Sequence, residues 1–218
     1  MDQEQYIPFS SPDITQEEID EVVAALRSGW ITTGPRTKLF EKRLAEFCNT
    51  STVCCLNSAT AALELALILM GIGPGDEVIT SAYTYTASCS PIIHVGATPV
   101  LVDVAPGSFH LDYDAVEKAI TEKTKVVIPV DIGGVMCDYD RLFQILEGKK
   151  ALYTPDSPVQ AAFDRVMVLA DSAHTIGATY KGKKAGEVAD FTAFSLVVLK
   201  NSMSDEYTGI RSEGSKAA

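Results

Sequence analysis

Short apolar segments alternate with amphipathic segments along most of this chain, and this alternation is the feature that most constrains its fold. Strands are expected at 53–56, 77–80, 99–104, 125–130 and 166–170. Helical periodicity predicts helices between them, at 60–70, 87–94, 113–120 and 140–147. The strands barely alternate between apolar and polar residues, which indicates burial on both faces. The sequence therefore predicts the α/β class, with a mostly parallel sheet flanked by helices.

Two further helices are expected before this alternating part. Thr15 and Glu18 have the spacing of a capping box, which predicts a first helix that ends near Gly29. A second helix is expected at 39–47, after a loop at 29–35.

The domain boundaries follow from where the apolar pattern stops. Residues 148–165 contain Pro155 and Pro158 and are expected to form an insertion. After Lys200 the residues are small and polar, so 202–218 are expected to be a disordered tail. One large domain over 1–201 is therefore predicted.

Charge and composition exclude several partners. A net charge of −11 argues against nucleic acid, because phosphate backbones are bound by clustered Lys and Arg. The most apolar helix, at 61–72, is too short to cross a bilayer and contains Glu64. The first residues lack the pattern of a signal peptide, and none of the five cysteines forms a Cys-x-x-Cys pair. We expect a cytoplasmic protein with free thiols, no metal and no membrane partner.

Two segments could in principle bind phosphate. Residues 57–60 lie between an expected strand and an Ala-rich helix, where the N–H groups of a helix start favour an anion. Ser58 could instead simply cap that helix, and spacing alone favours the cap. The glycines at 71–76 follow a helix and precede a strand, which is the reverse of a dinucleotide loop, so a turn is expected there.

Three residues near the C-terminal part could carry chemistry. Asp171 ends an apolar strand, where it could hold a cationic ring nitrogen or cap the next segment. His174 alone is more often structural than catalytic. Lys200 follows an apolar run, and a partly desolvated lysine is a common covalent nucleophile, although by itself it is more simply a surface lysine.

Considered together, these segments resemble the DegT/StrS-type sugar aminotransferases, a branch of the fold-type I enzymes that depend on pyridoxal 5′-phosphate (PLP). The similarity extends from about Ile7 to Asn201. It depends on the order and spacing of six motifs: GWITTGP at 29–35, SATAAL at 58–63, GPGDEVIT at 73–80, DSAH at 171–174, FS at 194–195 and KN at 200–201.

The resemblance implies roles for residues around the cofactor ring. Lys200 matches the lysine that binds PLP covalently and then transfers the proton. Asp171 matches the carboxylate that pairs with the pyridine nitrogen, which favours its protonated form. Tyr85 takes the place of the aromatic residue that stacks on the ring, and His174 matches a position near the ring hydroxyl.

Phosphate and substrate contacts are implied in the same way. The backbone amide of Ala59, with Thr60 and Ser195, resembles the phosphate site. The loop after the first helix lies where family members bind the sugar, and its residues are Trp30, Ile31, Thr32, Thr33 and Gly34.

The implied reaction passes an amino group from glutamate, through the cofactor, to a nucleotide-linked keto-sugar, in an enzyme that is typically a homodimer. The sequence departs from the family pattern at 196–197, and the segment from Ser202 replaces the usual Thr-x-x-Glu-Gly-Gly stretch. We therefore expect the small C-terminal domain to be absent and activity to be impaired. The alternatives are a non-catalytic remnant or interaction module with this fold, and a lyase or sugar dehydratase of the same fold. Lysine at 200 disfavours the dehydratase, where a histidine is usual.

Overall fold

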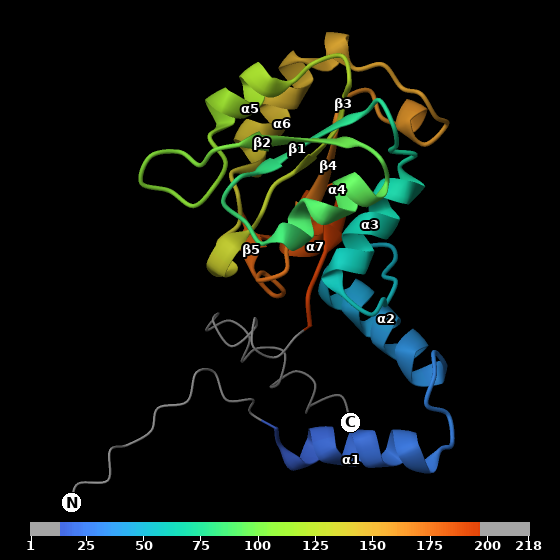
Figure 1. The fold of residues 1–218 in the computed structure, drawn as a ribbon. Helices are drawn as coiled ribbons and strands as arrows, with labels where there is room; N and C mark the ends of the chain where they lie inside the picture. The colour runs from blue at the N-terminus through green and yellow to red at the C-terminus, as the bar shows by residue number, and fades with distance from the viewer. Residues whose placement is uncertain (1–13, 197–218) are drawn as a thin grey trace, which may run out of the picture.

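The computed structural model describes residues 14–196, and its centre is a five-stranded sheet (Figure 1). The strands lie in the order β2-β1-β3-β4-β7, and each neighbouring pair is parallel. Their bounds are β1 Glu77–Ser81, β2 Thr98–Val102, β3 Thr124–Ile128, β4 Met167–Asp171 and β7 Phe191–Ala193. The predicted α/β class with a mostly parallel sheet is therefore confirmed.

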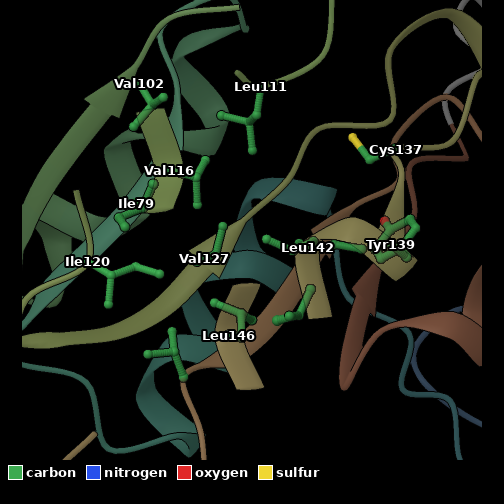
Figure 2. Packing of buried hydrophobic residues seen from close by; sticks show 13 residues of the cluster. Ile79, Val102, Leu111, Val116, Ile120, Val127, Cys137, Tyr139, Leu142 and Leu146 are labelled. Carbon is green, nitrogen blue, oxygen red and sulfur yellow. The ribbon is translucent and has the colours of Figure 1, made fainter. Parts of the chain in front are cut away.

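Helices cover both faces of this sheet (Figure 1). On one face, α3 (Ala59–Leu69) and α4 (Ser90–His94) contact a cluster that includes Val78 of β1. On the other, α5 (Tyr113–Ala119) and α6 (Tyr139–Gly148) contact a cluster that includes the next residue, Ile79. Figure 2 shows part of this second cluster, where Ile79 and Val127 of the sheet lie near Val116 and Leu142 of the helices. Successive side chains of one strand thus enter different cores, which explains why the strands are apolar throughout.

The strand order reverses between β1 and β3. After β1 the chain adds β2 on one side, and then crosses back over β1 to place β3 on the other. In an open parallel sheet, such a reversal leaves a crevice at the carboxyl ends of the two strands, where ligands commonly bind.

The N-terminal helices lie at one end of the molecule. α1 (Gln16–Arg27) begins with the predicted capping box, in which the backbone N of Thr15 donates to Glu18 Oε2 at 2.6 Å. It has no buried residue and lies apart from the sheet (Figure 1). α2 (Pro35–Phe47) is held through Leu44, which packs in a small cluster with Ile176.

Two expectations for the secondary structure were wrong. No strand forms at 53–56 within the described residues; the backbone N of Cys55 donates to Glu41 Oε1 at 2.9 Å instead of to a neighbouring strand. The helix expected at 87–94 is split into a 3-10 turn, η1 (Thr86–Ser88), and α4. Pro91 has no N–H to donate, so a continuous helix would lose a hydrogen bond there.

The segment 148–165 contains two 3-10 turns, η3 (Lys150–Leu152) and η4 (Gln160–Ala162), and is anchored to the sheet. Lys125 of β3, only 3% exposed, pairs with Asp156 at 2.7 Å. The fully buried Gln160 donates through Nε2 to the carbonyl of Gly71 at 3.2 Å. The expected turn at 71–76 is confirmed, since Asp76 N donates to Gly73 O at 3.1 Å.

Short elements after β4 were not expected from the sequence: a hairpin of β5 (Thr179–Tyr180) and β6 (Lys183–Lys184), and α7 (Ala185–Val188). Over the described range 14–196, no helix combines the length and the hydropathy needed to cross a membrane.

Candidate functional site

A cavity of about 310 Å³ lies at the carboxyl ends of the strands. Its walls come from the segments that follow β1, β3, β4 and β7, and from the first turn of α3. Six of the predicted cofactor residues, distant in the sequence, line it together: Ala59, Thr60, Tyr85, Asp171, His174 and Ser195. Topology explains this convergence, because the carboxyl ends of parallel strands share one edge of the sheet.

The Asp171 carboxylate is fixed at the end of β4 and is 6% exposed. Ser88 Oγ donates to its Oδ2 at 2.6 Å, and the backbone N of Ala173 donates to its Oδ1 at 3.3 Å. The carboxylate therefore caps the following turn and also lines the cavity, so the two interpretations of this residue are compatible. A cation at this point would gain a charge-assisted hydrogen bond.

The start of α3 forms another wall. Ser58 Oγ accepts from the backbone N of Ala61 at 3.1 Å, so the capping interpretation is confirmed. Ala59 and Thr60 follow within the first turn and line the cavity. The first N–H groups of a helix have no partner inside the helix and carry the positive end of its dipole. No lysine or arginine lines the cavity among residues 14–196, so an anion there would be bound by amides and hydroxyls.

Two ring side chains border the same space. Tyr85 is 75% exposed, so one face of its ring is available to a planar ligand. The backbone N of Gly133 donates to His174 Nδ1 at 3.3 Å. Because Nδ1 is thereby an acceptor, the neutral imidazole carries its proton on Nε2.

Asp131 lines the cavity as well, and sequence reasoning missed it. It is 1% exposed, and its Oδ2 accepts from Tyr139 Oη at 2.9 Å and from Ser172 Oγ at 2.7 Å. The backbone N of Cys137 donates to its Oδ1 at 2.8 Å. Asp131 thus joins the end of β3 to the turn that contains Asp171. Its position directly after a buried strand, like that of Asp171, was the available signal.

Burial raises the pKa of Asp131, against the opposing effect of its hydrogen-bond donors. A folded-state pKa above the unfolded value means that the folded protein holds this proton more tightly. The contribution of Asp131 to the free energy of unfolding is therefore fully present below the ordinary carboxyl pKa of about 3.9. It decreases as the pH rises through the raised pKa of the folded state. We predict that the unfolding free energy of wild type minus that of Asp131→Asn decreases from about pH 3.5 to pH 7.

Urea unfolding of both proteins across this pH range measures the difference. Asp138→Asn is the matched control with the opposite sign, because the hydroxyl of Tyr180 donates to Asp138 at 2.8 Å and lowers its pKa. For this control, the unfolding free energy of wild type minus that of Asp138→Asn should increase with pH. A flat or rising difference for Asp131→Asn would contradict the prediction.

The remaining predicted residues do not line the cavity in the described part of the chain. The loop Trp30, Ile31, Thr32, Thr33 and Gly34 joins α1 to α2, and Trp30 Nε1 donates within it to the carbonyl of Thr33 at 3.1 Å. Trp30 is 58% exposed and Ile31 is 75% exposed. Lys200 and the tail at 202–218 lie outside the described residues.

Comparison with known proteins shows what this chain is similar to. The model of the DegT/DnrJ/EryC1/StrS aminotransferase family matches residues 12–206. The spore coat polysaccharide biosynthesis protein SpsC of Bacillus subtilis is 41% identical over 196 residues, which are 90% of this chain and 46% of SpsC. The UDP-4-amino-4-deoxy-L-arabinose–oxoglutarate aminotransferase of Shewanella sediminis is 36% identical over 197 residues, 90% of this chain and 47% of that protein.

A solved structure is also similar to this chain. Spr1654 from Streptococcus pneumoniae, in its PLP form, superposes with a TM-score of 0.88 and 60% identity, over 89% of this chain and 50% of that one. The chain thus spans about half the length of the proteins that it matches.

Proposed function

Because the chain belongs to the DegT/DnrJ/EryC1/StrS aminotransferase family, we propose that it binds PLP in this cavity and takes part in transfer of an amino group to a nucleotide-linked keto-sugar. The observation that carries the proposal is the convergence of six predicted cofactor residues on one cavity. The matched region includes Lys200.

The residues present fit PLP. An acidic side chain, a helix start and an exposed aromatic ring border one cavity, and they complement the pyridinium, phosphate and planar ring of that cofactor. Bound PLP supplies an electron sink for the carbon that loses a proton. Asp171 would keep the proton on the ring nitrogen, and Ala59 and Thr60 would bind the phosphate with Ser195.

Two other residues would orient the cofactor and move protons. Tyr85 would cover one face of the ring, and His174 would donate to the ring oxygen. Lys200 would attach the cofactor and then carry the proton between carbon atoms, as general base and acid.

The names of the relatives support the substrate class. The Shewanella relative is named for a UDP-linked amino sugar and for oxoglutarate, the keto acid that glutamate becomes when it gives up its amino group. We therefore propose glutamate as the donor and a nucleotide-linked keto-sugar as the acceptor. The loop from Trp30 to Gly34 is proposed to contact the sugar.

We also propose a homodimer in the cytoplasm. All five cysteines, which lie within the described range, are free thiols, as is usual in a reducing compartment. Because the loop from Trp30 to Gly34 does not line its own chain's cavity, its contact with the sugar would have to come from rearrangement or from a second copy.

The test is the first half of the reaction. The 218-residue chain, loaded with PLP and freed of excess cofactor, is mixed with glutamate, and 2-oxoglutarate is measured with a coupled dehydrogenase. Stoichiometric 2-oxoglutarate is expected. PLP binding without 2-oxoglutarate would favour a remnant that retains only the cofactor site, and no binding at all would reject the proposal in favour of an interaction module.

A further inference from the structure

The segment after β1 places a buried hydroxyl against the acid of the site. Ser88 ends η1 and is fully buried, and its Oγ lies 2.6 Å from Asp171 Oδ2, although 83 residues separate the two in sequence. Thr84 lines the cavity, and its hydroxyl forms a hydrogen bond with that of Ser88, with 2.7 Å between Thr84 Oγ1 and Ser88 Oγ.

Donor chemistry gives these two bonds a direction. An ionised carboxylate only accepts, so the single hydroxyl proton of Ser88 is used on Asp171. Ser88 Oγ must then accept from Thr84, whose hydroxyl proton points toward it. The result is a chain of two hydroxyls that ends on a carboxylate, and each bond in such a chain polarises and strengthens the next.

We infer that Ser88, supported by Thr84, is a positioning residue that fixes the Asp171 carboxylate for the cofactor ring nitrogen. This inference rests on the proposed function. Ser88 holds Oδ2 from inside the protein, whereas the bond from Ala173 to Oδ1 is longer, at 3.3 Å, and leaves that oxygen available to a ligand.

The same turn also carries Tyr85, the aromatic side chain proposed to cover the ring. The backbone N of Ser88 donates to the carbonyl of Tyr85 at 3.1 Å. This bond closes the turn between Tyr85, the proposed ring cover, and Ser88, whose side chain contacts Asp171. The position of Tyr85 and the orientation of Asp171 are therefore set together.

The test compares PLP binding to the 218-residue chain and four variants, by absorbance titration. Ser88→Ala removes the donor and is expected to weaken binding about 10-fold, the usual effect of one hydrogen bond to a charged group. Ser88→Thr keeps the hydroxyl and should restore most of the affinity. Thr84→Val should have a smaller effect than Ser88→Ala. Thr86→Val, at an exposed hydroxyl of the same turn, is the matched control and should bind as wild type does.

A spectroscopic readout separates positioning from a general loss of structure. The absorbance of bound PLP depends on protonation of its ring, so Ser88→Ala should change the pH dependence of that absorbance, and Ser88→Thr should return it. Wild-type affinity and an unchanged spectrum in Ser88→Ala would overturn the inference. Circular dichroism of each variant checks folding, and Thr84→Val carries the test if Ser88→Ala does not fold.

A second measurement needs no cofactor, so failure of the proposed function can be told apart from failure of this inference. In the chain labelled with ¹³C at aspartate carboxyl groups, the Asp171 signal should move in Ser88→Ala and return in Ser88→Thr. If wild type does not bind PLP but this signal moves, only the proposed function fails. If the signal stays in place, the Ser88 inference fails.

Discussion

Replacement of Lys200 by alanine is expected to abolish covalent attachment of PLP to the 218-residue chain. The side-chain amine is the nucleophile in the proposed site, and alanine has no group that could take its place. Wild type mixed with PLP should develop the absorbance band of lysine-bound cofactor, and the variant should not. Mass spectrometry after borohydride reduction should find the added mass in wild type alone.

Lys123→Ala is the matched control for this change. Lys123 is an exposed lysine directly before β3, at the amino end of the sheet and thus opposite the cavity. Its replacement should leave attachment intact. If Lys200→Ala retained the band, or if Lys123→Ala lost it, another lysine would be the point of attachment, and the role given to Lys200 would be wrong.

Replacement of Asp171 by alanine is expected to weaken PLP binding by about 100-fold or more. The loss combines a charge-assisted hydrogen bond with the cost of a pyridinium left without a partner in a partly buried site, which together reach about 3 kcal/mol. Equilibrium dialysis against PLP measures the change.

Asp171→Asn separates charge from shape. The amide can still accept from Ser88, which lies 2.6 Å from the carboxylate, but it carries no charge to keep the ring nitrogen protonated. We expect affinity between those of wild type and Asp171→Ala, with an absorbance that no longer matches a protonated ring. Wild-type binding in both variants would mean that PLP lies elsewhere.

The central strands could be predicted because burial on both faces leaves a continuous apolar run. The run at 166–170 became β4, Met167–Asp171, with a shift of one residue. A similar run at 53–56 failed because no strand among residues 14–196 pairs with it, and a strand needs a partner as well as propensity.

β7 was not predicted from the sequence. It spans only Phe191–Ala193, and the more apolar residues lie after it in the sequence rather than within it. Asp190, directly before β7, forms a two-bond ion pair with Arg165, at 2.7 and 2.8 Å. That pair joins two segments that only the folded chain brings together.

Some residues of the site could be predicted from the sequence, and others could not. Asp171 could be found because it follows a buried strand, and family motifs included Ala59, Thr60, His174 and Ser195 among the lining residues. Ser88 could not, because its importance comes from a contact 83 residues away, and a buried serine in a turn resembles many others. Asp131 had the same signal as Asp171, at the end of β3, and was overlooked.

A crystal structure of the 218-residue chain grown with PLP tests the proposed cofactor site most directly. The ring nitrogen is expected within hydrogen-bond distance of Asp171, about 2.7–3.2 Å, and the phosphate at the first turn of α3. PLP bound away from the cavity, or with its phosphate rather than its ring nitrogen toward Asp171, would contradict the proposed site.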